Sequence, residues 1–109
     1  MERLRTLCLA LPEAAEKEAW GVPTFRVKDK MFAVVSPRDG ISVWVKAPEG
    51  AQEFLTEADP DRFFKPPYLG PKGWVGIMLD PPPDWHEVDA HVRRSYQLVA
   101  PKKLAAAMG

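Results

Sequence analysis

Cationic side chains alternate with apolar ones near the end of the first quarter of the chain. Arg26 and Lys28 alternate with Phe25 and Val27, and Lys30 follows two positions later. Because successive side chains of a β-strand point to opposite faces, the cations are expected to share one face of a strand. Lysine and arginine neutralise phosphate groups when they bind nucleic acid. This strand face is therefore a candidate surface for DNA.

Further cations occur in segments that contain no acidic residue. Residues 62–79 hold three cations and no acid, and the tail from residue 92 holds four cations and no acid. Lys46 is expected on the same strand face as Trp44, and exposed aromatic rings stack on bases. To the same candidate surface we assign Arg26, Lys28, Lys30, Arg38, Lys46, Lys72, Lys102 and Lys103.

The overall charge limits this hypothesis. Fifteen basic and fifteen acidic residues cancel to a formal net charge of zero, which counts against a protein that coats nucleic acid by bulk charge. Binding would require that cations from separate segments gather on one face. The alternative is that the cations are ordinary solvated charges on the polar outer face of an antiparallel sheet.

Four tryptophans are many for 109 residues. Trp85 belongs to the apolar stripe of a predicted helix, and a tryptophan in such a stripe is expected in the core. Trp20 and Trp74 each neighbour a glycine, and they are candidates for lining a cleft instead. A cleft of this kind would suit a small ligand.

No catalytic or metal-binding signature accompanies these residues. His86 and His91 are five positions apart, so they do not share a helix face as two metal ligands would. Cys8 is the only cysteine, and no glycine elbow surrounds Ser95. The Gly-Pro-Lys-Gly segment at 70–73 precedes a predicted strand, whereas a phosphate loop opens a helix. We therefore expect no enzyme, no metal and no cofactor.

The spacing of apolar residues predicts the elements that position these side chains. An N-terminal helix is predicted over residues 4–11, and the segment 16–20 is ambiguous, with an edge strand as one reading. The remaining prediction comprises strands at 24–28 and 31–35 with a turn at 29–30, a turn at 37–40, a strand at 41–46, a helix at 48–58, an extended connection at 59–73, a strand at 74–79, a helix at 85–99 capped by Asp84, and a short helix from residue 101.

This order of elements predicts a single domain over residues 1–109 with an α+β fold. In it, an antiparallel sheet is backed by the N- and C-terminal helices as a two-layer sandwich. The charged N-terminal segment lacks the features of a signal peptide, and no apolar run is long enough to span a membrane. With one cysteine and no disulfide, we expect a cytoplasmic protein without a membrane partner.

Several motifs together resemble a known family. They are Trp20-Gly21, Pro23-Thr24-Phe25-Arg26-Val27, Lys30 with Phe32-Ala33, Lys46, Gly70-Pro71 with Gly73-Trp74-Val75, Trp85, and Ser95-Tyr96 followed by Lys102-Lys103-Leu104. In this order they resemble the MmcQ/YjbR family of small bacterial proteins. The resemblance implies a CyaY-like, secretion-chaperone-like fold and a DNA-binding role through a "double-wing" arrangement of hairpins. The chain departs from the pattern at Asp29, where such turns commonly carry a glycine.

Three hypotheses follow. The first is a non-enzymatic DNA-binding module that uses the hairpin cations and the basic C-terminal tail. The second is a protein-interaction or chaperone-like module that binds a partner through an aromatic and apolar patch. The third is an enzyme or small-ligand binder with a cleft at Trp20 and Trp74. Salt-dependent binding would favour the first hypothesis, because phosphate contacts release counterions.

Overall fold

The computed structural model of the protein describes residues 2–37 and 40–107. Its strands form one six-stranded sheet in the order β1-β2-β3-β4-β6-β5, and every neighbouring pair is antiparallel. The elements are α1 (Glu2–Leu9), β1 (Ala15–Ala19), β2 (Val22–Val27), β3 (Lys30–Ser36), β4 (Ser42–Lys46), α2 (Ala51–Ala58), β5 (Phe63–Phe64), η1 (Gly70–Lys72, a 3-10 turn), β6 (Trp74–Met78), α3 (Trp85–Val99) and α4 (Lys102–Ala107).

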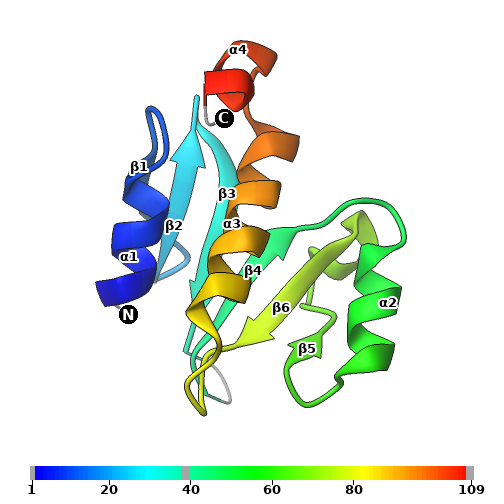
Figure 1. The fold of residues 1–109 in the computed structure, drawn as a ribbon. Helices are drawn as coiled ribbons and strands as arrows, with labels where there is room; N and C mark the ends of the chain where they lie inside the picture. Colours follow the sequence, from blue (N-terminus) through cyan, green and yellow to red (C-terminus); the bar gives the residue numbers. More distant parts are fainter. Residues whose placement is uncertain (1, 38–39, 108–109) are drawn as a thin grey trace.

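Helices α1 and α3 cover one face of the sheet, whereas α2 lies beside the β5–β6 edge (Figure 1). The core between the two layers consists of alternate strand residues and the apolar stripes of α1 and α3. Fully or nearly fully buried there are Leu4, Phe25, Val27, Val43, Val45, Val75, Ile77, Val88, Val92 and Tyr96. The predicted α+β fold, with an antiparallel sheet backed by the N- and C-terminal helices, is confirmed.

Helix α3 begins where its sequence signals predict. The Asp84 carboxylate accepts a hydrogen bond of 2.9 Å from the backbone N–H of His86, and it thereby satisfies a donor that the helix leaves free. The opposite end of α3 is followed by Pro101, which cannot continue a helix. Fifteen residues of regular apolar spacing therefore fix this helix and its register against the sheet.

The turn between β2 and β3 lies one residue earlier than predicted. Lys28 and Asp29 form it, with φ angles of 49° and 64°. Two-residue hairpin turns of type I′ require positive φ at both central positions, which explains why glycine is common in them. Lys28 therefore leaves the strand face that it was expected to share with Arg26, and Lys30 becomes the first residue of β3.

Two further segments differ from the prediction. The connection at 59–73, predicted to be extended throughout, contains the short strand β5 and the turn η1. The helix predicted at 48–58 begins only at Ala51, because Gly50 adopts a left-handed conformation with φ 86°. The ambiguous segment near the N-terminus forms β1, an edge strand whose lysine and glutamates face solvent. Charged side chains on an edge strand discourage pairing with another chain.

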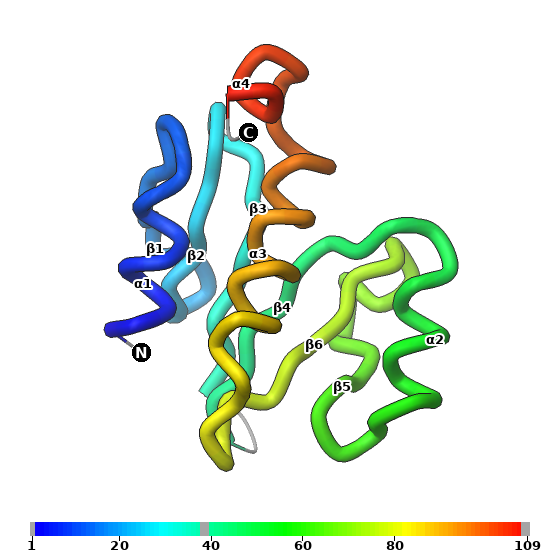
Figure 2. The backbone as a smooth tube through the Cα atoms, viewed as in Figure 1, coloured from blue at the N-terminus to red at the C-terminus, as the bar shows by residue number. Residues whose placement is uncertain are grey.

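The antiparallel topology brings distant parts of the chain to one end of the sheet. Lys30 begins β3, Lys46 ends β4, and Lys46 pairs with Trp74 at the start of β6. The C-terminal part of α3 and helix α4 lie at this same end, near the β2–β3 hairpin (Figure 2). Within the described ranges, no helix is long and apolar enough to cross a membrane.

Candidate functional site

Six cations come from the segments that meet at this end of the sheet. None of them forms an ion pair with a residue that the structure describes. We call this set the cationic end; it consists of Lys30, Lys46, Lys72, Arg94, Lys102 and Lys103. All six are exposed or half-exposed, so their charges are available to an anionic ligand. Arg38, which was predicted to belong to the same surface, lies outside the described residues.

Two shallow grooves cross the cationic end. The first, which we call the strand-end groove, has a volume of about 240 Å³. It is lined by Lys30, Met31, Lys46, Trp74, Leu98 and Val99. Its two lysines come from the start of β3 and the end of β4, whereas its apolar walls come from β6 and the last turn of α3.

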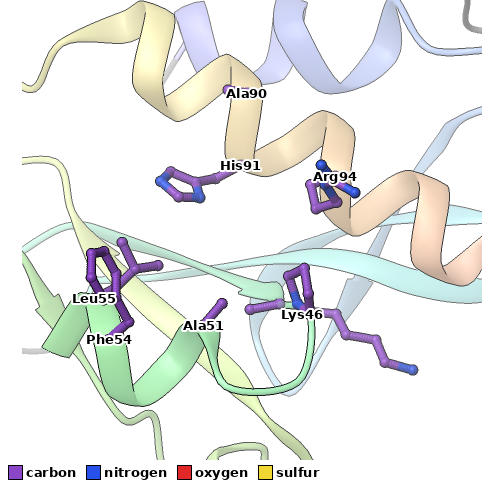
Figure 3. Close-up of a pocket in the computed structure, with 9 residues that line it drawn as sticks. Lys46, Ala51, Phe54, Leu55, Ala90, His91 and Arg94 are labelled. Atoms are coloured by element: carbon purple, nitrogen blue, oxygen red, sulfur yellow. The ribbon is translucent and has the colours of Figure 1, made fainter.

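The second groove, which we call the helix groove, lies between α2 and α3 (Figure 3). It has a volume of about 320 Å³ and is lined by Lys46, Ala47, Pro48, Ala51, Phe54, Leu55, Ala90, His91 and Arg94. Lys46 borders both grooves, and no carboxylate lines either of them. The two grooves therefore meet at Lys46, and every charged side chain that lines them is a cation, although the Glu87 carboxylate lies close enough to act on His91.

The side chains of the helix groove differ in exposure. Phe54 is 69% exposed, which is unusual for a phenylalanine in a small domain. His91 is half-buried and its ring meets the Phe63 ring edge-on, with 5.5 Å between the ring centroids. Burial lowers the pKa of His91, although the nearby Glu87 carboxylate opposes this shift. The imidazole is therefore neutral at pH 7, and it offers one hydrogen-bond donor and one acceptor.

Two of the predicted cations are engaged with acidic neighbours. Arg26 donates to the Thr24 hydroxyl at 3.1 Å, and its guanidinium lies 3.8 Å from the Asp29 carboxylate. The Lys28 ammonium lies 2.8 Å from the Glu13 carboxylate, and the hydrogen bond to Glu13 raises the pKa of Lys28. A phosphate would have to compete with these carboxylates. Arg26 and Lys28 are therefore not counted among the unpaired cations of the cationic end.

The two tryptophans assigned to a cleft lie far apart in the sheet. Trp20 is 77% exposed in the turn between β1 and β2, whereas Trp74 is only 6% exposed at the start of β6. Strands β3 and β4 separate β2 from β6. Trp74 contributes a wall to the strand-end groove, and Trp20 lines neither groove. The structure therefore does not bring these two residues together.

Other residues considered as sites have structural partners. The Ser95 hydroxyl is buried and hydrogen-bonds to the backbone of two strands. Burial raises the pKa of Cys8 to about 12, so its thiol stays protonated at neutral pH. Trp85 is partly buried against the core, with the guanidinium of Arg3 5.5 Å from its ring centroid. Within residues 2–37 and 40–107, no group of three or more metal-ligating side chains occurs.

Among the groove residues that the sequence analysis did not assign to a binding site, three could contact a ligand through an aromatic ring or a polar group: Phe54, His91 and Arg94. Arg94 lies in the acid-free tail, and Ala90, Arg94 and Leu98 follow at intervals of four along one face of α3. A helical projection of α3 could have found this stripe. The position of α2 opposite the stripe depends on tertiary packing, so no local pattern could have revealed the helix groove.

Comparisons with known proteins agree with this architecture. The crystal structure of Deinococcus radiodurans protein DR2400, with a DUF419 domain, superposes with a TM-score of 0.79 and 26% sequence identity. The match covers 89% of this chain and 75% of the other. A comparison with curated proteins found no match. The family model described as YjbR matches residues 9–98, which is most of the chain. The chain therefore belongs to the YjbR family.

Proposed function

We propose that this domain binds DNA through the phosphate backbone, using the cationic end as its contact surface. The observation that carries the proposal is the gathering of six cations at one end of the sheet without carboxylate partners. Phosphate contacts supply most of the affinity of proteins that bind nucleic acid without sequence preference. In this proposal the domain is a binding module and not an enzyme.

The distribution of charge along α3 supports the choice of the cationic end as the surface that contacts DNA. Glu87 and Asp89 lie in the N-terminal half of the helix, whereas Arg94 lies toward its C-terminal end, followed by the lysines of α4. In this formally neutral molecule the acids nearest the β2–β3 turn, Glu13 and Asp29, pair with Lys28 and Arg26, whereas the cations of the cationic end have no carboxylate partner among the described residues. A surface of this kind contacts phosphates and positions the protein, but it does not read base edges.

A protein partner is the second candidate, and one observation favours it. Phe54 projects beside Leu55 and Ala51, so the helix groove offers an apolar surface that an amphipathic segment could cover. A partner bound through apolar contacts alone would be insensitive to salt. The unpaired cations around the groove favour an anionic ligand, and we therefore place DNA first.

The test is a titration of a labelled duplex of about 20 base pairs by fluorescence anisotropy, at salt concentrations of about 50–200 mM. The informative variant is Lys30→Gln/Lys46→Gln/Arg94→Gln. Each lost phosphate contact should reduce the slope of log affinity against log salt by about one. The matched control removes the same charge from paired cations: Lys17→Gln/Lys28→Gln/Arg93→Gln.

The proposal predicts weak binding that decreases steeply with salt and is largely lost in the first triple variant. The control variant should keep most of the affinity, because its cations already have carboxylate partners. Thermal unfolding monitored by circular dichroism would verify that both variants fold. Binding that is independent of salt, or equal losses in the two triple variants, would overturn the proposal.

A further inference from the structure

We infer that the helix groove accepts an unstacked base of a single-stranded nucleic acid, with Phe54 as the stacking platform and Lys46 and Arg94 contacting the flanking phosphates. This inference rests on the proposed function and makes it more specific, because it names the form of nucleic acid that the surface selects. It is carried by the exposure of Phe54, the size of the helix groove and the arrangement of the cations around it.

The exposure of Phe54 is the first observation. Its side chain is 69% exposed although it borders a hollow in the surface. An aromatic ring in a small domain usually buries a large area in the core. A phenylalanine left open beside cations has the composition of a single-strand binding site, in which bases stack on aromatic rings and basic groups follow the backbone.

The size of the helix groove is the second observation. Its volume of about 320 Å³ lies at the lower end of the range of about 300–1,000 Å³ that is typical of small-ligand sites. Such a hollow suits one base rather than a length of duplex. In a duplex the bases are stacked inside the helix, so only a single strand or an extruded nucleotide can present a base face to Phe54.

The arrangement of cations is the third observation. Figure 3 shows the Lys46 side chain extending away from the hollow, whereas His91 and Arg94 come from α3 on its opposite wall. Lys46 also lines the strand-end groove together with Lys30. A strand with a base in the helix groove could therefore run past Lys46 and place its next phosphate near Lys30. The neutral His91 imidazole can hydrogen-bond to the edge of the bound base.

The experiment compares Phe54→Ala with Phe54→Tyr, using a labelled oligothymidine of about 15 nucleotides as probe. Loss of the ring should reduce the affinity about tenfold, because one stacked base is lost. The tyrosine variant should retain the affinity, since it keeps a ring. The slope of affinity against salt should stay unchanged in both variants, because no charge is removed. Tyr68→Ala, which removes an aromatic side chain that is 89% exposed and lines neither groove, is the matched control.

Two further probes separate stacking from charge. An abasic oligonucleotide of the same length carries the same phosphates without bases, and it should bind the unchanged protein about tenfold more weakly. The abasic oligonucleotide should bind the Phe54→Ala variant and the unchanged protein with the same affinity, because it has no base to stack on the ring. A duplex of the same sequence should also bind more weakly than the single strand. Equal affinity for single strand, abasic strand and duplex, with no effect of Phe54→Ala, would overturn this inference while leaving the proposed DNA binding intact.

Two other outcomes would also overturn the inference. Failure of every nucleic acid probe to bind would remove the proposed function together with it. A designed amphipathic helix of leucine and glutamate that binds more tightly than the oligothymidine, and does so only when Phe54 is present, would assign the groove to a protein partner. Because Phe54 contributes little to the core, its variants should remain folded, and a thermal unfolding curve would verify this.

Discussion

The backbone N–H of Lys46 donates a hydrogen bond of 2.9 Å to the hydroxyl of Ser95, which is buried in α3. The same hydroxyl donates a bond of 2.6 Å to the carbonyl of Phe32. The pairing of β2 with β3 shifts in register at this point, so that Phe32 has no partner on β2. Such a bulge leaves a strand residue outside the regular ladder. The Ser95 hydroxyl therefore connects α3 to both β3 and β4 by hydrogen bonds. Because Arg94 precedes Ser95 in the helix, these bonds also position Lys46 close to Arg94.

Ser95→Ala should lower the free energy of unfolding by about 1–3 kcal/mol. The substitution leaves the part-buried N–H of Lys46 and the buried C=O of Phe32 without the hydroxyl that now serves both, and unsatisfied buried groups are costly. Urea denaturation followed by circular dichroism measures this change. Thr6→Ala is the control, because its hydroxyl is on an exposed face of α1 and bonds only to the Glu2 carbonyl. The control should change stability by less than about 0.5 kcal/mol. Equal stability of the two variants would show that the Ser95 bonds contribute nothing measurable.

Gly76 lies directly opposite Phe64 in the pairing of β5 with β6. A Cβ atom at Gly76 would lie 2.3 Å from Cζ of the Phe64 ring, so the ring would have to move. We expect Gly76→Ala to destabilise the protein by about 1–3 kcal/mol through overpacking. The measurement is again urea denaturation.

Gly70→Ala is the control for this prediction. At Gly70 the nearest atom to a new Cβ, in the Lys65 side chain, would be 3.6 Å away, and the backbone φ is not positive. The double variant Gly76→Ala/Phe64→Ala should lose less stability than the sum of the two separate losses, because Phe64→Ala removes the ring with which the new Cβ clashes. Strict additivity would mean that the ring contact is not the cause.

The elements that could be predicted from the sequence are those with a regular apolar period. Strands β4 and β6 each direct alternate residues into the core, although Trp74 and Gly76 on the other face of β6 are buried too, and α3 keeps its apolar stripe over almost four turns. Such periods follow from the geometry of strand and helix alone, so no tertiary information is needed. Strand β5 could not be predicted this way, because two residues are too few to show an alternation.

The candidate site was predictable only in part, because the pairing and exposure of its side chains depend on contacts between residues that are distant in the sequence. The sequence predicted Lys30 in a turn and Lys46 at the end of a strand, and the antiparallel pairing of β3 with β4 places both along one groove. Whether a cation has a carboxylate neighbour depends on residues that are distant in sequence. Lys28 pairs with Glu13, fifteen positions away, through the turn that follows α1. Phe54 falls within the helix predicted at 48–58, but its exposure depends on where α2 packs.

The stability of the protein should depend on pH through His91. Burial lowers the pKa of this imidazole in the folded state, whereas in the unfolded chain the pKa is about 6.5. The unfolded state therefore binds more protons as the pH falls below about 6.5. Stability should be fully present above that value, and it should decrease as the pH falls toward the folded-state pKa.

His91→Gln should remove this part of the pH dependence, because glutamine does not titrate. The measurement is the free energy of unfolding in urea at several values between about pH 5 and pH 8, the range in which histidine changes its charge. His86→Gln is the control, since His86 is exposed in the first turn of the same helix. The free energy of unfolding of this control should change with pH as it does in the unchanged protein. If stability decreases equally with falling pH in both glutamine variants and in the unchanged protein, the loss of stability at acidic pH originates from carboxylates, and His91 is not the titrating group.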